Sequence, residues 1–387
     1  MKRIFYLFIL LVTILPLNTL PQSVARAAET PEENSGAVLC TPGVYLQTPD
    51  DCVPLGPSQY LTNNARLGME LPLRPLLISH PDPALSDLPY KYYWVDPKLG
   101  TGFYPTIDAA RGKAGGQIIP PGNFIFTTYD QRLDTDKGTY FLRSDGTYMP
   151  GNGSTYGKVS PFPGVEVHST PRNAFGFVIQ PTDVRREPNF LPYNAPIRQL
   201  NPYDVVQVYS VQRIEGFVWC LIGPDEWVLG NNRVVVVTPN TTPPDGVTNQ
   251  RWIDINLAEQ TLAVYDNGQM VYATVIATGE KPLYTRPGLF PIYKKLETET
   301  MQGGGGTSEY YYLEKVPWTM YFDKARALHG AYWRAKFGYT QSHGCVNLSP
   351  GDAHWLFNWA KEGDWVYVHD PSGQTPTDPA LYGDGGA

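Results

Sequence analysis

The stretch Trp252-Ile-Asp-Ile-Asn-Leu257 opens the region whose pattern decides the fold. Apolar and polar residues alternate along it, as they do in a half-buried β-strand. A second strand pattern, Gln260-Thr-Leu-Ala-Val-Tyr265, is followed by the turn Asp266-Asn-Gly268, and Asn-Gly is a strong hairpin signal. Residues 270–278 predict a third strand. The C-terminal part of the chain is therefore expected to contain a β-sheet.

One prominent helix is predicted near the end of this region. Ser349 is placed to cap it, Pro350 takes the first helical position, and Gly363 is expected to end it. Four apolar residues share one face of this helix: Ala353, Leu356, Phe357 and Ala360. The strand pattern Trp365-Val-Tyr-Val-His369 follows, so the helix has a sheet on which to bury that face. The sequence predicts a mainly β fold, a sandwich with one helix.

Composition agrees with a chain made mostly of strands and turns. The 387 residues include 37 glycines, 37 prolines and 26 tyrosines, and only 17% are charged. This balance favours short strands and many turns over long helices. The net charge is −7, and no run of Lys or Arg interleaved with aromatic residues follows the first few positions. Such a chain lacks the basic surface that nucleic-acid binding requires, so nucleic acid is excluded as a partner.

The N-terminus has the layout of a secretory signal peptide over residues 1–28. A positively charged start precedes an apolar run from Ile4 to Leu17, and small residues follow it. An uncleaved membrane anchor is the alternative, although the run is short for a bilayer span and contains Pro16. We therefore expect a secreted, extracytoplasmic protein with no membrane segment beyond the signal peptide.

An internal repeat precedes the C-terminal region. Phe124-Ile-Phe-Thr-Thr-Tyr-Asp-Gln-Arg-Leu133 resembles Val205-Val-Gln-Val-Tyr-Ser-Val-Gln-Arg-Ile214, and each is followed by an aromatic strand and a turn that ends in Gly-Asn. Two copies of one small β unit are predicted. The pattern resembles bacterial SH3-like modules. This resemblance implies either wall binding through exposed aromatic residues or a spacer whose aromatic residues fill two small cores.

The chain is thus expected to divide into seven segments, with the Pro- and Asn-rich stretches as linkers. Their boundaries are 1–28 for the signal peptide, 29–95 for an irregular linker, 96–160 and 161–238 for the two SH3-like repeats, 239–250 for a second linker, 251–370 for the catalytic domain and 371–387 for a C-terminal tail.

Four cysteines differ in their surroundings. Export favours disulfides, and Cys40 and Cys52 bracket a short loop that a disulfide would close, with two free thiols as the alternative. Cys220 lies in an apolar stretch and is predicted to be buried. Cys345 lies among polar and ionisable groups, so only this cysteine is a candidate for chemistry.

Two histidines accompany Cys345. His329-Gly330 and Ser342-His343-Gly344-Cys345-Val346-Asn347 fall between the predicted strands and the helix. A thiol attacks a carbonyl as its thiolate, so it benefits from an imidazole that accepts its proton. Glycines allow backbone N–H groups to approach the oxygen that becomes an oxyanion. The cluster therefore indicates nucleophilic acyl transfer.

The string Ser342-His343-Gly344-Cys345-Val346-Asn347 with its upstream His329 resembles the signature of the L,D-transpeptidase (YkuD-like) family. The resemblance extends over residues 252–370. It implies that Cys345 is the nucleophile, that His329 is its base, and that the Gly330 carbonyl orients that imidazole. The N–H groups of Gly344 and Cys345 would form the oxyanion hole.

The same resemblance gives further residues supporting roles. His343 would shape the site, and Ser342 and Asn347 would hold the loop by hydrogen bonds. Tyr321 would line the donor pocket, with a core position as its alternative. A zinc site built from His329, His343, Cys345 and His354 lacks paired ligand spacing, so neither metal nor cofactor is predicted. His354 and His369 are expected to be structural.

The reaction that the resemblance implies is formation of 3-3 cross-links between peptidoglycan stem peptides by a monomer associated with the cell wall. A peptidoglycan hydrolase or carboxypeptidase, and a non-catalytic wall-binding protein on the same fold, are the alternatives. In papain-like hydrolases the cysteine precedes the histidine, whereas here His329 comes first. Gln302-Gly-Gly-Gly-Gly-Thr307 is interpreted as a mobile flap over the donor site or as a loop without a role.

Overall fold

The computed structural model describes residues 57–69, 72–156, 160 and 163–385. The predicted signal peptide and the pair Cys40 and Cys52 lie outside the described residues. The chain divides into two compact units, residues 1–62 and 63–387. Helix α1 (Pro57–Arg66) spans their boundary, and the two large sheets belong to the second unit. Among the described residues, no helix is both long and apolar enough to cross a bilayer.

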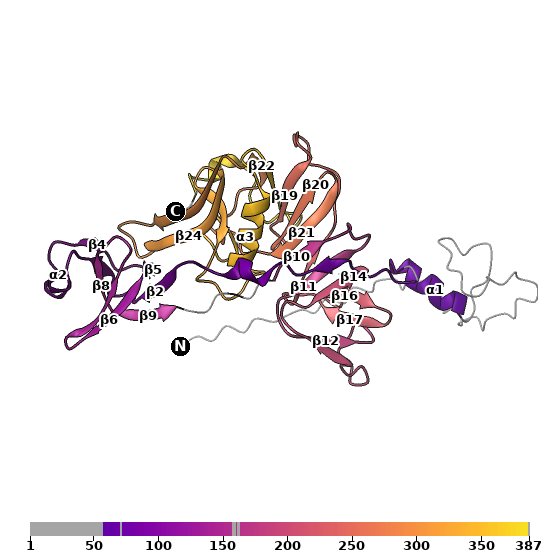
Figure 1. Ribbon diagram of the computed structural model, residues 1–387. Helices are drawn as coiled ribbons and strands as arrows, with labels where there is room; N and C mark the ends of the chain where they lie inside the picture. The colour runs from indigo at the N-terminus through magenta and orange to yellow at the C-terminus, as the bar shows by residue number, and fades with distance from the viewer. Residues whose placement is uncertain (1–56, 70–71, 157–159, 161–162, 386–387) are drawn as a thin grey trace, which may run out of the picture. The chain divides into compact units, whose positions relative to one another are not determined.

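Two seven-stranded sheets form the framework of the second unit (Figure 1). The first sheet has the order β1 (Ile78–Ser79), β10 (Val165–Val167), β21 (Gln269–Val275), β20 (Thr261–Asp266), β19 (Arg251–Asn256), β27 (Trp365–His369) and β22 (Gly288–Pro291). The second has the order β26 (Val346–Leu348), β25 (Arg326–Gly330), β24 (Tyr311–Asp323), β5 (Phe124–Tyr129), β2 (Lys91–Val95) and β9 (Gly153–Tyr156), with β23 (Lys294–Gly303) paired to β24. The mainly β prediction is confirmed.

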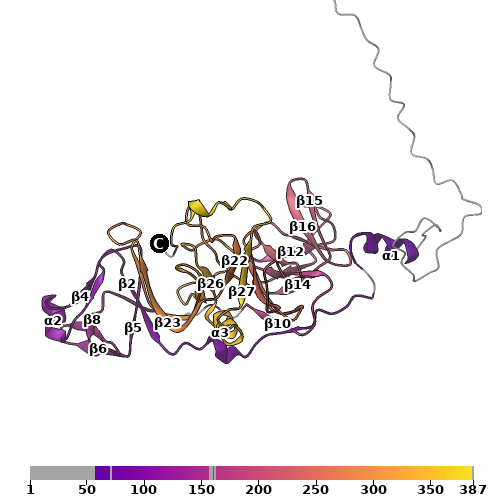
Figure 2. The same ribbon diagram turned by 90° about the horizontal axis from the view of Figure 1, so that it is seen from above.

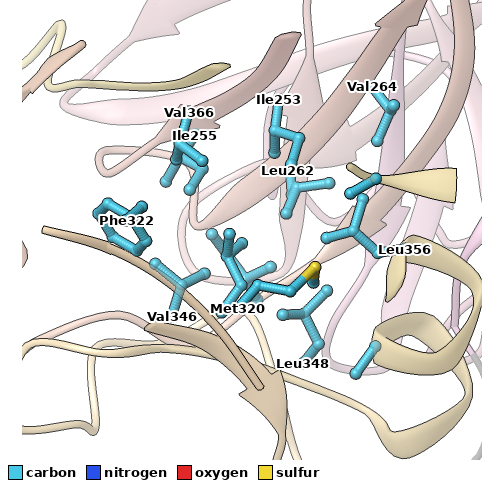
Figure 3. Close-up of a cluster of buried hydrophobic side chains, with 14 of the residues drawn as sticks. Ile253, Ile255, Leu262, Val264, Met320, Phe322, Val346, Leu348, Leu356 and Val366 are labelled. Atoms are coloured by element: carbon cyan, nitrogen blue, oxygen red, sulfur yellow. The ribbon is translucent and has the colours of Figure 1, made fainter. Parts of the chain in front are cut away.

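The main core lies between these sheets. Figure 3 shows Ile253, Ile255 and Leu262 of the first sheet facing Met320 and Val346 of the second. All five side chains are fully buried. Burying a large aliphatic side chain contributes about 1.5–3 kcal/mol, so these alternating apolar residues hold the sheets together. The sandwich predicted from the strand patterns is therefore present.

Helix α3 (Pro350–Trp359) packs on this core and begins as predicted. The Ser349 hydroxyl accepts a hydrogen bond from the Asp352 N–H, and Pro350 stands at the first helical position. The predicted end was wrong. Ala360 is the C-cap in extended conformation, so the helix stops before Gly363. Ala360 is nevertheless buried, because its side chain completes the core from outside the helix.

The internal repeat corresponds to two units with the same strand order. The first repeat unit, residues 91–156, contains β2, β3 (Thr101–Phe103), α2 (Ile107–Gly112), β4 (Gln117–Ile119), β5, β6 (Gln131–Thr135), β7 (Gly138–Leu142), β8 (Tyr148–Pro150) and β9. The second, residues 174–237, contains β11 (Ala174–Val178), β12 (Thr182–Arg185), β13 (Arg198–Leu200), β14 (Val205–Val208), β15 (Ser210–Ile214), β16 (Phe217–Gly223), β17 (Glu226–Leu229) and β18 (Val234–Val237).

Most of the strand pairing is also shared, although the β12–β17 pair of the second unit is reduced in the first to a single bridge between Tyr104 and Tyr148. β2 lies between β5 and β9, and β11 lies between β14 and β18, all antiparallel. β6-β7-β8 and β15-β16-β17 are equivalent meanders. The first unit begins at β2, inside the span that we expected to be a linker. The likeness of these units to SH3 modules stays a prediction.

The chain segments outside the C-terminal region take part in both large sheets. β10, which lies between the repeat units, pairs with β21, and β1 pairs with β10. The expected linker 29–95 thus supplies β1, the 3-10 turn η2 (Pro83–Ser86) and β2. The C-terminal tail contains η3 (Pro379–Leu381), and the Ala325 N–H donates to the Asp384 carbonyl at 2.9 Å. Backbone pairing between distant segments leaves no periodic signal in either one, so the sequence did not predict it.

Candidate active site

Two short parallel strands carry the predicted site residues. The register of β25 and β26 places His329 opposite Asn347 and Leu328 opposite Val346. Cys345 comes directly before β26, so the thiol stands at the start of the strand beside the one that holds His329. Parallel strands need a long return connection, and residues 331–345 supply it. The Ser-His-Gly-Cys string is the end of that connection.

The loop before β26 is fixed by its own hydrogen bonds. The Ser342 hydroxyl donates to the Cys345 carbonyl at 2.5 Å and accepts from the Gly344 N–H at 3.2 Å. Thr285 Oγ1 donates to the Gly344 carbonyl at 2.9 Å. Gly344 has a φ of +111°, where a side chain would be strained, so the loop requires glycine here. The predicted oxyanion donor Gly344 therefore has a partner in this state.

Cys345 is almost enclosed, with 9% of its surface exposed. Its Sγ atom donates weakly to the Ala325 carbonyl at 3.7 Å. Burial raises the pKa of the Cys345 thiol, because a thiolate loses its hydration there. Within the described residues, no hydrogen bond joins Sγ to His329 or His343. The resting form of the site is thus a neutral thiol.

His329 is a neutral base in this environment. It is 2% exposed, and burial lowers the pKa of its imidazole to about 4. Its Nδ1 atom lies 3.4 Å from the Gly330 carbonyl oxygen, the contact expected to orient the ring. Hydrogen bonding assigns the Asn347 amide with its oxygen toward Arg334 and its nitrogen toward Nε2 of His329, at 3.1 Å. The proton of the ring is therefore on Nδ1, and the Nε2 lone pair accepts from Asn347.

Arg334 places a positive charge beside both imidazoles. The Asn347 amide oxygen accepts from Arg334 Nε at 2.6 Å, and the guanidinium also donates to Gln341 Oε1 at 2.7 Å. After burial, the charge of Arg334 contributes to the lowered pKa of His329 and of His343. His343 is half-buried, and its ring centre is 5.5 Å from that of Tyr311. Both histidines are kept neutral.

A cavity of about 280 Å³ brings most of these groups together. Its lining consists of Asn123, Phe124, Met301, Tyr311, Leu313, His329, Trp333, Arg334, Gln341, Ser342, His343, Cys345 and Asn347. Five of the eight predicted site residues are among them. Gly330 and Gly344 are not part of its lining. Tyr321 does not line it, since this ring lies against Tyr293, with 6.1 Å between their centres.

The Cys345 sulfur and the neutral imidazole of His329 thus line one cavity, the first just before β26 and the second on β25. Residues 250–368 match the YkuD family of L,D-transpeptidase catalytic domains. L,D-transpeptidase 2 of Mycobacterium tuberculosis (strain CDC 1551 / Oshkosh) is 30% identical over 121 residues. These residues make up 30% of this chain and 30% of that protein, so the match spans less than a third of either.

Solved L,D-transpeptidases are also similar to this chain. The crystal structure of the Enterococcus faecium L,D-transpeptidase C442S mutant is 26% identical, covering 34% of this chain and 55% of that one, with a TM-score of 0.30. L,D-transpeptidase from Mycobacterium smegmatis is 16% identical, covering 53% of this chain and 89% of that one, also with a TM-score of 0.30.

Several residues that line the cavity were missed from the sequence. Trp333 and Arg334 follow His329 closely, and this proximity was a usable signal. Tyr311 belongs to the strand after the glycine run. Asn123 and Phe124 lie outside the L,D-transpeptidase match altogether, and nothing in the sequence connects them with Cys345.

Cys220, His354 and His369 have structural surroundings. Cys220 is buried, and burial raises its pKa to about 12. His354 stacks on Trp318 with 4.3 Å between ring centres, and His369 Nε2 lies 2.8 Å from an Asp254 carboxylate oxygen. Among the described residues, no group of three or more His, Cys, Asp or Glu side chains is arranged to hold a metal ion.

Proposed function

We propose that this protein is a peptidoglycan L,D-transpeptidase that forms 3-3 cross-links. The observation that carries the proposal is that Cys345 and the neutral base His329 line one cavity inside the region that matches L,D-transpeptidase catalytic domains. A thiol with a raised pKa and an imidazole with a lowered one hold the proton on sulfur until a carbonyl arrives.

The first half of the proposed reaction acylates the enzyme. Sγ of Cys345 forms a bond with the carbonyl carbon of the L-configured centre of the third stem residue, and its proton moves to His329. The carbon–nitrogen bond to the terminal D-Ala then breaks, and the imidazolium returns the proton to the leaving amine. The products are a thioester and free D-Ala.

The second half transfers the acyl group to an amine. The side-chain amine of a second stem attacks the thioester carbon and loses a proton to His329, and the sulfur leaves with that proton. Because Cys345 is only 9% exposed, water has little access to the thioester, which favours an amine acceptor over hydrolysis. This chemistry would take place outside the cytoplasm, on the cell wall.

Two hydrogen bonds must be exchanged during acylation. Nε2 of His329 accepts from Asn347 at rest, so the amide has to release the lone pair before that nitrogen takes a proton. The Asn347 backbone is held at both its N–H and its carbonyl by Ala277, each at 2.9 Å, so only its side chain needs to turn. The Gly344 N–H must leave Ser342 Oγ to bind an oxyanion.

Mass spectrometry with a purified stem tetrapeptide tests the proposal. The wild type should form a thioester with loss of D-Ala, and addition of a second stem should release a cross-linked dimer. A carbapenem, as a covalent probe, should add mass to the wild type and none to Cys345→Ala. An adduct on the alanine variant, or no acylation of the folded wild type by either compound, would rule the assignment out.

A further inference from the structure

The first repeat unit is joined to the active-site hairpin by backbone pairing. β23 and β24 form this hairpin, which reaches the first repeat unit (Figure 2). There β24 runs parallel to β5, with Tyr311 opposite Phe124 and Leu313 opposite Phe126. The Asn123 N–H also donates to the Tyr310 carbonyl at 2.7 Å. The start of β24 is thus an internal strand of a sheet, held on both sides.

A buried ion pair strengthens this junction. Glu314 of β24 accepts from Arg143 at 2.5 Å through one carboxylate oxygen and from the Thr128 N–H at 2.8 Å through the other. The side chains of Arg143 and Glu314 are 8% and 9% exposed. Both partners of the Glu314 carboxylate belong to the first repeat unit. If Arg143 were lost, a charge would be left buried without its counter-ion.

The same junction brings the first repeat unit into the cavity. Asn123 and Phe124 line it together with His329 and Cys345. The Phe124 ring centre lies 6.0 Å from that of Trp333, which lies 5.7 Å from that of His329. Phe124 is therefore separated from the proposed base by a single aromatic ring.

The second repeat unit shows that this arrangement is not a property of the repeat itself. β14 is the counterpart of β5, and among the described residues it is the terminal strand of its sheet. Val205, the first residue of β14, is the counterpart of Phe124 and packs against a different core cluster, which includes Phe175. The first repeat unit thus contributes a strand edge and an aromatic ring to the cavity, and the second repeat unit contributes neither.

We propose that the first repeat unit is part of the active site. Phe124 and Asn123 form a wall that contacts the peptide acyl donor. The Arg143–Glu314 pair acts as a positioning clamp, which holds the hairpin so that Tyr311 and Leu313 face Cys345. The donor is an extended peptide, whose aliphatic side chains pack on the Phe124 ring and whose amides bond to Asn123. This inference rests on the proposed function, since it identifies where the acyl donor lies.

Variants at Phe124 test the wall, with Val205→Ala as the matched control in the second repeat unit. Phe124→Ala should lower kcat/KM for tetrapeptide acylation by about 10²-fold, as expected when a positioning surface is lost. Phe124→Leu should recover part of it, and Val205→Ala should behave as the wild type. The rate of alkylation of Cys345 by iodoacetamide should be equal in all four proteins, because this small reagent does not depend on contacts with Phe124 to reach the thiol.

The outcomes separate the two proposals. A wild type that iodoacetamide alkylates but no stem peptide or carbapenem acylates would refute the proposed function. Acylation of the wild type together with unchanged kcat/KM in Phe124→Ala would overturn the wall alone. If alkylation also falls in Phe124→Ala, the effect is general and the wall is likewise rejected.

The clamp is tested by the double variant Arg143→Met/Glu314→Gln, which removes both charges. Its control is Arg198→Met/Glu226→Gln, an exposed pair in the second repeat unit. Hydrogen exchange at Tyr311–Leu313 should accelerate more than about tenfold in the clamp variant only. The kcat/KM for tetrapeptide acylation should fall mainly through a higher KM, because the hairpin is no longer held in the position that binds the peptide. Faster exchange with unchanged acylation, or unchanged exchange, would overturn the clamp.

Discussion

Nε2 of His329 lies 3.1 Å from the side-chain nitrogen of Asn347 and makes no hydrogen bond with Cys345. The amide stabilises the neutral imidazole, because a protonated Nε2 has no lone pair with which to accept. The loop asparagine, expected to hold the backbone, therefore also keeps the base unprotonated.

Asn347→Ala should raise the pKa of His329 from about 4 toward its ordinary value, because the neutral ring loses a hydrogen-bond donor. The acid limb of carbapenem acylation, measured between about pH 3 and 8, should move to higher pH. Asn358→Ala on the exposed side of α3 serves as control. Coincident acid limbs in Asn347→Ala and the wild type would contradict the role of this amide.

The Cys345 thiol should ionise at a higher pH than a free cysteine. Since burial raises its pKa, the rate of iodoacetamide alkylation should climb at a pH above the ~8.5 of a free thiol. Cys220, with a pKa of about 12, should stay unlabelled in the folded protein. Cys345→Ala supplies the background. A midpoint below that of free cysteine would show a thiolate at rest and refute the neutral-pair mechanism.

Stability at acid pH should depend on two buried groups, His329 and Asp352, whose pKa values are shifted in opposite directions. His329 has a pKa of about 4 when folded and about 6.5 when unfolded, so the unfolded chain binds more protons between these values. Its contribution to stability is complete above about pH 6.5, and about 3 kcal/mol is lost as the pH falls to about 4. Burial raises the pKa of Asp352 to about 6, so its contribution is greatest below about pH 4 and is lost as the pH rises through 6.

His329→Gln should therefore become more stable as the pH falls from about 6 to 4, whereas Asp352→Asn should lose stability steeply over the same window. Chemical unfolding at several pH values measures both slopes. Parallel pH profiles for the two variants would show that these pKa directions are wrong.

In the turn between β23 and β24, the backbone requires glycine at one position and tolerates a side chain at the next. Gly304 has a φ of +66°, and an added Cβ would lie 2.6 Å from the Glu309 carbonyl oxygen, whereas a Cβ on Gly305 would meet nothing within 4 Å. Gly304→Ala should lower stability by about 1 kcal/mol or more and slow acylation, and Gly305→Ala should change neither. Thermal unfolding measures the change in stability of the two variants, and the rate of tetrapeptide acylation measures the change in activity. Equal effects would mean that the flap responds to glycine content and not to this turn.

Local signals predicted local structure well. Asn267 and Gly268 both have positive φ in the turn between β20 and β21, as an Asn-Gly hairpin requires. Ser349 caps α3 because its hydroxyl needs only an N–H three residues later. The cysteine, both histidines, Ser342 and Asn347 line one cavity because a parallel strand pair and one short loop bring them together.

What the sequence did not predict depends on distant partners. Phe124 pairs with β24 through backbone N–H and C=O groups. Because every residue carries these groups, the sequence of a strand does not identify the strand with which it pairs. Tyr321 lies on β24 with Tyr311 and Leu313, and its ring contacts that of Tyr293, so its place in the donor pocket stays a prediction. Arg334 is a different case, since it lies in a turn after β25 where no periodic pattern applies, and only its short separation from His329 pointed to it.

The mixed origin of the two large sheets has a consequence for how the chain is made. During synthesis β10 emerges before β21, and β5 emerges before β24, so both wait with unpaired backbone edges. Such edges recruit other strands, and pairing over long sequence separations is slow. A polypeptide that terminates before β24 would present β5 as an open edge, and we expect it to aggregate instead of persisting as a harmless fragment.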